Sequence, residues 1–189
     1  MINRREDFGL LLNELGLIGE AVEIGTHRGA FAVALLEKWK GRVLHCVDPW
    51  ENIPEFDDVQ VSRLITCLDG AEDREEDFQH AKNVLSRFGD RVVLHRTVSL
   101  KFVKQCSNES IDFVYLDGNH RYKEVRRDLI AWLPKIRPGG LLAGHDIDRV
   151  EWSKEIRPAV EEVGLPINLV RQPDDPWSYF LVKPCASTE

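Results

Sequence analysis

The chain has 189 residues, of which 43% are hydrophobic and 30% charged, and its formal net charge is −7. This composition is typical of one globular domain with a full hydrophobic core, so we expect residues 1–189 to form a single domain. The negative charge argues against a nucleic-acid partner, because proteins that grip phosphate backbones need a basic face.

The sequence carries no signal for export or for a membrane span. Its first residues lack the apolar segment of a secretory signal, and no apolar run approaches the ~20 residues that span a bilayer. The four cysteines contain no Cys-x-x-Cys pair, which argues against a zinc knuckle, a redox motif and a disulfide framework. We therefore expect a cytoplasmic protein with no membrane partner, and we leave open whether it forms a homo-oligomer.

Hydrophobic periodicity predicts strands that alternate with helices along the chain. We expect helices over 3–15, 29–39, 74–88, 121–133 and 151–163, and a short helix or turn over 99–106. We expect strands over 21–24, 43–47, 92–94, 111–116, 141–143, 167–170 and 179–182, the fifth entered through a turn at Pro138-Gly139-Gly140. Such alternation produces a mostly parallel sheet between helix layers, and two final strands in succession add an antiparallel hairpin.

The acidic segment 51–73 is hard to assign from its pattern. We interpret it as a long connection near the site, either a lid or a solvated loop.

A glycine turn follows the first strand and opens the first long helix. It reads Glu23-Ile24-Gly25-Thr26-His27-Arg28-Gly29. Gly25 permits close approach of the backbone to a ligand, and Gly29 lets the helix begin close to the strand. The pattern lacks the Gly-x-Gly-x-x-Gly of dinucleotide sites, which disfavours NAD and FAD. Asp48 ends the second strand about 20 residues later, where an acid can bind ribose hydroxyls.

Two other predicted strand ends carry acid and histidine. Asp117 and His120 follow the fourth strand, and His145 and Asp146 follow the fifth. Ligands bind at the carboxyl ends of strands in open α/β sheets, so we expect these residues to form one site. Carboxylates suit a hard divalent cation, and two neighbouring acids without a cation would repel. The structural alternative is that Asp117 caps the 121–133 helix and His145 packs in the core.

Together these motifs resemble those of the class I S-adenosylmethionine-dependent methyltransferases over residues 18–183. The resemblance rests on Glu-Ile-Gly-Thr-x-x-Gly from Glu23, Val-Asp-Pro-Trp through Asp48, Asp-Gly-x-His-x-Tyr from Asp117, and the Pro-Gly-Gly and His-Asp that follow. The sequence is most similar to the small O-methyltransferase branch that includes metal-dependent sugar and macrolide-sugar methyltransferases, like methyltransferase family 24. This resemblance implies a three-layer α/β/α Rossmann-like fold whose seven-stranded sheet has the order 3-2-1-4-5-7-6.

The resemblance also implies roles for individual residues. The cofactor-binding residues would be Glu23, Gly25, Thr26, Gly29, Asp48, Pro49, Trp50, Ser99 and Asp117. Within this set Glu23 and Gly25 would line the methionine end, Asp48 the ribose and Ser99 the adenine. A divalent metal, Mg²⁺ or Mn²⁺, would be bound by Asp117, His145 and Asp146. His120 and Asp117 would be catalytic, His120 as the base. The chain departs from some relatives at His145 and from many at Val98, because an acid stands at those positions there.

We therefore expect an enzyme, an S-adenosylmethionine-dependent O-methyltransferase. Its acceptor would be a small molecule with a free hydroxyl, a sugar or another hydroxylated metabolite, and a divalent metal would assist. Two other classes stay open. A metal-dependent hydroxylase or hydrolase would use the same Asp and His residues without S-adenosylmethionine. A cofactor-binding module would bind S-adenosylmethionine without an intact metal site.

Overall fold

A computed structural model describes residues 2–51 and 74–185 of the chain. Seven strands form one sheet: β1 (Glu20–Ile24), β2 (Val43–Asp48), β3 (Val92–Arg96), β4 (Ile111–Leu116), β5 (Ile136–Gly144), β6 (Asn168–Val170) and β7 (Ser178–Val182). Their order is β3-β2-β1-β4-β5-β7-β6. The pairs among β1 to β5 are parallel, and β7 runs antiparallel to both β5 and β6. This topology confirms the predicted fold class.

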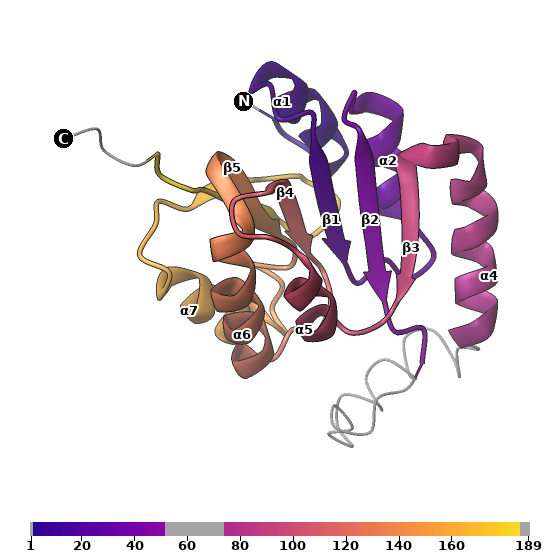
Figure 1. Cartoon of the computed structure of the whole chain (residues 1–189). Coiled ribbons are helices and arrows are strands. Elements are labelled where there is room, and N and C mark those ends of the chain that lie inside the picture. The colour runs from indigo at the N-terminus through magenta and orange to yellow at the C-terminus, as the bar shows by residue number, and fades with distance from the viewer. Residues whose placement is uncertain (1, 52–73, 186–189) are drawn as a thin grey trace.

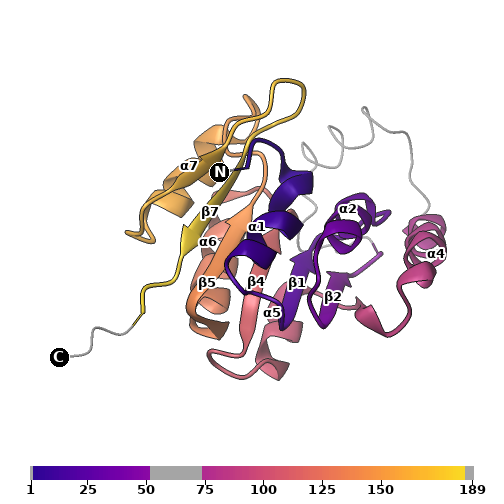
Figure 2. The same cartoon turned by 90° about the horizontal axis from the view of Figure 1, so that it is seen from above.

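Helices cover both faces of the sheet, as Figures 1 and 2 show. They are α1 (Phe8–Glu14), α2 (Ala30–Lys38), α4 (Arg74–Leu85), α5 (Ser99–Phe102), α6 (Tyr122–Trp132) and α7 (Ser153–Glu161). The side chains of α1, α2 and α4 share one core cluster, and those of α5, α6 and α7 share another. No helix of the described residues is long and apolar enough to cross a membrane. The predicted connection 51–73 lies outside the described residues except for Glu51.

Strand β4 is the central strand of the sheet, and all six of its residues are therefore buried. A parallel strand that is covered on both faces needs apolar side chains on both, which explains its continuous apolar run. The ring of Tyr115 stacks on Phe31 of α2 with centroids 3.9 Å apart, and Phe8 of α1 packs against both. This aromatic cluster fixes α1, and with it the residues just before α1, over the sheet.

One local prediction was wrong. The Pro138-Gly139-Gly140 segment lies inside β5 and is not a turn that precedes it. Ile111 pairs with Ile136 and Phe113 with Leu141, so β5 carries extra residues that bulge from the ladder. Proline donates no backbone hydrogen bond and Gly139 has a φ of 77°, which is why the bulge falls here. Within this segment the Gly139 N–H donates to the Lys183 carbonyl, and the Lys183 N–H donates to the Gly140 carbonyl. The bulged part of β5 therefore stays paired with the chain that follows β7.

Backbone hydrogen bonds continue past the carboxyl ends of β1, β4 and β5. Gly25 N–H donates to the Val47 carbonyl at 2.9 Å, and Asp117 N–H donates to the Ile24 carbonyl at 2.8 Å. His145 N–H donates to the Leu116 carbonyl at 3.2 Å. The first residues after β1, β4 and β5 are therefore in register, and Asp117 and His145 lie at the same edge of the sheet as the glycine turn.

The closest of these contacts gives a stability test at Gly25. A Cβ there would lie 2.1 Å from the Asp117 carbonyl oxygen, and the φ of 87° already disfavours other residues. Gly164 has a φ of 72°, but a Cβ at that position meets nothing within 4 Å. We expect Gly164→Ala to cost only the left-handed conformation, ~1–2 kcal/mol. Gly25→Ala should cost ~1–3 kcal/mol more, because the overlap forces the backbone to move.

Denaturant unfolding of both variants measures this difference. Equal losses of unfolding free energy in the two variants would show that β1 and β4 do not approach this closely.

Candidate functional site

Asp48 is held at the end of β2 by two backbone groups. Its Oδ2 accepts a hydrogen bond from the His27 N–H at 2.9 Å, and its Oδ1 accepts one from the Trp50 N–H at 2.7 Å. His27 and Trp50 have φ values of 49° and 43°, a left-handed backbone that aims both N–H groups at the carboxylate. Burial raises the pKa of Asp48, and the two N–H donors oppose that shift. Each oxygen keeps a lone pair for a further donor.

Glu23 is a buried acid at the end of β1, with 2% of its surface exposed. Thr26 donates its hydroxyl hydrogen bond to Glu23 Oε2 at 3.0 Å, and the Cys46 thiol lies beside the same carboxyl. Burial raises the pKa of Glu23 to about 8 despite these donors. A nearby positive charge would stabilise its ionised form, so this position suits a cationic ligand.

Three other residues predicted to bind the cofactor, Gly29, Pro49 and Trp50, lie at the end of the glycine turn and just after β2. Gly29 has a φ of 84° and is the N-cap residue of α2, and Pro49 is partly exposed after Asp48. Trp50 is buried, donates from Nε1 to the His27 carbonyl at 2.7 Å and packs on Phe78.

Ser99 is the first residue of α5, and its hydroxyl faces α6. It donates to Asp128 at 2.5 Å and accepts from Trp132 Nε1 at 2.9 Å. Its side chain is therefore engaged by protein groups, so a ligand at this position would meet the backbone of Ser99.

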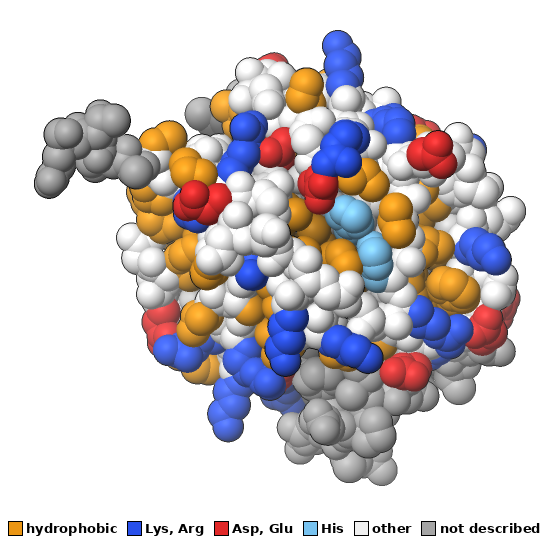
Figure 3. Space-filling model, viewed as in Figure 1, with side chains coloured by type: hydrophobic (Ala, Val, Ile, Leu, Met, Phe, Trp, Pro, Cys, Tyr) orange, Lys and Arg blue, Asp and Glu red, His pale blue; other side chains and the backbone are white. Residues whose placement is uncertain are grey.

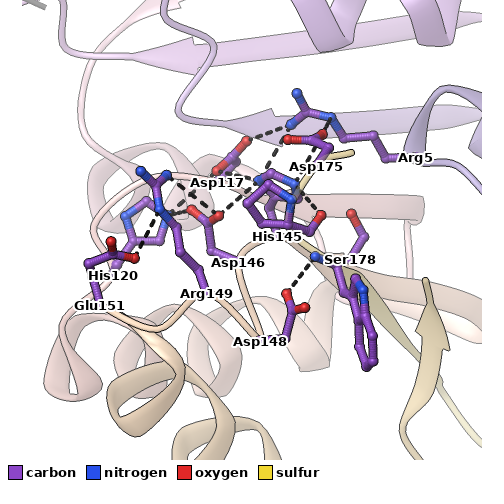
Figure 4. A network of polar contacts seen from close by, with 12 residues as sticks. Arg5, Asp117, His120, His145, Asp146, Asp148, Arg149, Glu151, Asp175 and Ser178 are labelled. Carbon is purple, nitrogen blue, oxygen red and sulfur yellow. Dashed lines mark hydrogen bonds and ion pairs between the residues drawn. The ribbon is translucent and has the colours of Figure 1, made fainter. Parts of the chain in front are cut away.

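The second half of the site is a cluster of Asp117, His120 and Asp146, shown in Figure 4. One ligand atom from each residue lies within 4.8 Å of the others. His120 Nε2 is 2.9 Å from Asp146 Oδ2 and 3.6 Å from Asp117 Oδ1. The imidazole also stacks on Trp152, with ring centroids 5.4 Å apart. The cluster thus offers two carboxylates and one nitrogen to a common point.

Two buried atoms of this cluster lack a hydrogen-bond partner among the described residues: His120 Nε2 and Asp146 Oδ1. The short contact between His120 and Asp146 therefore has the distance of a hydrogen bond without its geometry. Buried polar atoms in this condition are costly unless a missing partner satisfies them.

His145 approaches the same acids from β5. Its Nδ1 lies 3.7 Å from Asp117 Oδ1 and 3.5 Å from Asp146 Oδ1. Its Nε2 lies 2.9 Å from the Pro176 carbonyl, an acceptor that places the ring proton on Nε2. Arg5 Nη1 lies 3.4 Å from Nδ1, so a guanidinium donor faces that nitrogen.

The charges in the cluster shift one another's pKa values. Burial alone would raise the pKa of Asp117, but the contacts with His120 and His145 outweigh burial and hold it well below its usual range. Burial would lower the pKa of His120, yet Asp117 and Asp146 raise it to about 9. The pKa of His145 is also raised, because Asp117 outweighs the effect of burial. Without a cation, the Asp117 carboxylate is therefore stabilised by the His120 imidazolium and by its contact with His145.

Arg5 was not predicted as a site residue. Its guanidinium lies 3.5 Å from Asp117 Oδ2 and 3.1 Å from Asp175 Oδ2, and its backbone N–H donates to Gln172. Arg5 thus ties the start of the chain and the loop before β7 to the cluster (Figure 4). No local pattern marks Arg5 or Asp175, because both reach the site only through tertiary packing.

Asp117 does not cap α6. Tyr122 N–H donates to Glu155 of α7 at 2.8 Å, and Arg121 N–H donates to Asn119 at 2.9 Å. The structural alternative for Asp117 is therefore not observed.

A family model described as a methyltransferase domain matches residues 22–147, about two thirds of the chain. The chain belongs to this methyltransferase family, which confirms the resemblance that its motifs indicated. The matched span includes both the Glu23–Asp48 half and the Asp117–Asp146 half of the site.

Solved structures share the fold at low sequence identity. An O-methyltransferase from Bacillus cereus in complex with SAH is 18% identical, with a TM-score of 0.66, over 95% of this chain and 80% of that chain. The O-methyltransferase TomG of Streptomyces achromogenes, involved in tomaymycin synthesis and solved with SAM, is 15% identical. Its TM-score is 0.63, over 95% of this chain and 79% of that chain.

A precorrin 8w decarboxylase from Methanobacterium thermoautotrophicum is 17% identical, with a TM-score of 0.61, over 92% of this chain and 87% of that chain. The shared fold alone therefore does not specify the reaction. An uncharacterized protein of Acanthamoeba polyphaga mimivirus is 30% identical over 53 residues. That match spans 28% of this chain and only 24% of the viral protein.

The pKa of Glu23 predicts how stability depends on pH. The folded value of about 8 exceeds the ordinary 4.5, so the folded state binds this proton more tightly than the unfolded state. The resulting stabilisation is fully present below pH 4.5 and is lost as the pH rises through 8. At about 1.4 kcal/mol per pKa unit, the loss is on the order of a few kcal/mol.

Glu23→Gln should flatten this part of the profile, measured by denaturant unfolding from pH 5 to 9. Glu37→Gln makes the same change on the exposed face of α2 and is the control. Parallel profiles for Glu23→Gln and the wild type would contradict the assigned pKa.

Proposed function

We propose that this chain is an S-adenosylmethionine-dependent O-methyltransferase that methylates a hydroxyl of a small-molecule acceptor with help from a divalent metal. The observation that carries the proposal is that the Asp117–His120–Asp146 cluster lies beside the glycine turn that follows β1. One half suits a cationic nucleoside cofactor, and the other suits a cation that binds a hydroxyl oxygen. A sugar or another hydroxylated metabolite fits this chemistry, and the net charge of −7 speaks against a nucleic-acid acceptor.

The cofactor half is supported by the chemistry of two acids. S-adenosylmethionine carries a positive sulfonium and an amino group, and Glu23 is a buried acid that a nearby cation would ionise. Asp48 has both oxygens oriented by backbone N–H groups and still has lone pairs for two ribose hydroxyls. We assign Glu23, Gly25 and Thr26 to the methionine side and Asp48, Pro49 and the Ser99 backbone to the nucleoside side. The buried Trp50 supports the glycine turn by donating a hydrogen bond to the His27 carbonyl.

The residues of the acceptor half fit a divalent metal. Their donor set is two carboxylates and one imidazole, and His120 Nε2 and Asp146 Oδ1 are buried without hydrogen-bond partners among the described residues. A set with more oxygen than nitrogen favours Mg²⁺ or Mn²⁺ over softer ions. When bound, such an ion lowers the pKa of a coordinated hydroxyl and orients it.

His120 is the nitrogen ligand in this proposal. The sequence motif suggested His120 as the base and His145 as the ligand. His120 Nε2 lies closer to both carboxylates than His145 Nδ1, which has the Arg5 guanidinium beside it. A neutral imidazole that ligates through Nε2 carries its proton on Nδ1 and does not accept another. We therefore place His145 next to the ligand set.

The chain's own residues supply orientation. Arg5 and His145 hold Asp117, and Trp152 fixes the plane of the His120 ring. The Asp117 backbone packs on Gly25, so the cluster and the cofactor turn are joined at one residue. Holding nucleophile, methyl carbon and sulfur in line turns a bimolecular step into an effectively unimolecular one.

Calorimetric titration with S-adenosylmethionine and S-adenosylhomocysteine tests the cofactor half. We expect saturable binding of both, weakened ~10-fold or more in Asp48→Asn, because hydrogen bonds to a charged acceptor are each worth ~1.5–3 kcal/mol. Asp90→Asn, an exposed change of the same kind, should bind like the wild type. An intact chain that binds neither ligand would instead support the metal-dependent hydroxylase or hydrolase.

Methyl transfer to a panel of glycosylated metabolites, with and without EDTA, tests the acceptor half. We expect EDTA to abolish transfer, and full activity after EDTA would contradict the metal role. Saturable cofactor binding without transfer to any acceptor would favour the binding module.

Electron paramagnetic resonance of added Mn²⁺ separates the two roles of His120. We expect His120→Ala to weaken Mn²⁺ binding at least ~10-fold, by analogy with the cost of disturbing residues around a metal. Loss of turnover with unchanged Mn²⁺ affinity would make His120 the base.

A further inference from the structure

A second group of histidines lies away from the candidate site. His45 in the middle of β2 and His95 near the end of β3 are diagonal neighbours, since His45 pairs with Val93 and His95 pairs with Val47. Their neighbours Leu44, Cys46 and Leu94 pack with α2 and α4, so both histidines point to the opposite face. Neither the methyltransferase motifs nor the proposed reaction uses them.

The sheet is thinly covered at this place. Helix α5 is a single turn, and its Phe102 packs on the pair, with centroids 4.2 Å from His95 and 5.7 Å from His45. His45 keeps 19% of its side chain exposed, and the adjacent Val93 is 39% exposed. In Figure 1 none of the drawn helices crosses in front of β2 and β3, and Figure 3 shows histidine side chains at the surface in the same view. An ion from solvent can reach the pair.

The geometry points to a second metal site: we propose that His45 and His95 together bind a transition-metal ion of borderline softness, Ni²⁺ or Cu²⁺. His45 Nδ1 and His95 Nε2 are 3.0 Å apart. Around an ion at ~2.1 Å from each nitrogen, that separation gives an N–metal–N angle of about 90°. This is the angle between adjacent positions of an octahedral or square-planar ion, whose remaining positions water would fill.

Glu20 favours the tautomer of His45 that can bind a metal through Nδ1. Its Oε2 lies 3.4 Å from His45 Nε2, on the far side of the ring, and Arg42 holds the same carboxylate. A carboxylate in this position places the ring proton on Nε2 and leaves the Nδ1 lone pair directed toward His95. Histidines that bind metals have this arrangement almost always, with the second nitrogen donating to a carboxylate or carbonyl.

Both imidazoles are available as neutral ligands. Burial lowers the pKa of His45, although Glu20 opposes the shift, and burial lowers that of His95 as well. An ion therefore does not have to displace a proton from a charged ring at neutral pH. The two sites also differ in chemistry. The Asp117 cluster has two oxygens and one nitrogen, whereas this pair has two nitrogens and selects softer metals.

A bound ion would join β2 to the edge strand β3. Asp48 ends β2, and Ser99 follows β3 after a short loop, so both strands lead to the nucleoside side of the candidate site. The ion would bind the folded protein alone, since only folding brings His45 and His95 together, and binding of this kind raises the thermal midpoint. The proposal does not depend on the methyltransferase assignment.

The test uses the whole chain and Ni²⁺ as the probe, with Mg²⁺ as the comparison ion. Titration calorimetry of the wild type should show Ni²⁺ binding that weakens at least ~10-fold in both His45→Gln and His95→Gln. His80→Gln, the same change at an exposed residue of α4, should bind Ni²⁺ like the wild type. Unchanged Ni²⁺ affinity in the folded His45 and His95 variants would overturn the site.

A second measurement needs no variant. Diethyl pyrocarbonate modifies accessible histidines, and peptide mapping by mass spectrometry locates the products. We expect Ni²⁺ but not Mg²⁺ to protect His45 and His95 together, while His80 reacts equally in all samples. Modification of His45 and His95 at the same rate with and without Ni²⁺ would show that the pair is only a hydrogen-bonded contact.

Discussion

Asp117 joins the two halves of the candidate site, and the rest of the arrangement depends on it. Its backbone N–H extends the pairing of β4 with β1 at 2.8 Å, and its carbonyl packs where Gly25 offers only a hydrogen. Its carboxylate faces His120, His145 and Arg5. Because the sheet fixes the backbone of Asp117, the Asp117–His120–Asp146 cluster is held at a constant distance from the glycine turn. In the proposed reaction, this distance determines whether the methyl group of the cofactor and the hydroxyl of the acceptor can be aligned.

The two halves have opposite electrostatic character. On the cofactor side burial raises the pKa values of Glu23 and Asp48, so these acids gain most from a ligand that brings positive charge. On the acceptor side Asp117 is already stabilised in its charged form by imidazoles, and Arg5 adds a guanidinium. A divalent ion would replace positive charge that the protein now provides itself. Under the proposed function, two cations, the sulfonium and the metal, would lie on either side of Asp117.

The sequence was sufficient to predict the elements that depend on local pattern. The apolar run of β4, the glycine turn after β1 and the acids and histidines after β4 and β5 predicted the edge at which Asp117, His120, His145 and Asp146 meet. The order of the strands was predicted from the resemblance to the methyltransferases. Pro138-Gly139-Gly140 was misread because a bulge and a turn need the same residues, and only the partner strands distinguish them. Arg5 and Asp175 were missed because their positions follow from how distant segments pack. The orientations of Ser99 toward Asp128 and of His120 toward both acids depend on tertiary contacts in the same way.

The most direct test of the account is a crystal structure of the chain with S-adenosylhomocysteine and Mn²⁺, with anomalous scattering recorded at the manganese edge. The account predicts an anomalous peak bounded by Asp117, His120 and Asp146, with the cofactor's ribose at Asp48 and its methionine part at Glu23. A crystal with the cofactor bound but no peak at this cluster, or with manganese coordinated elsewhere, would contradict the claim that the cofactor and the metal meet at Asp117.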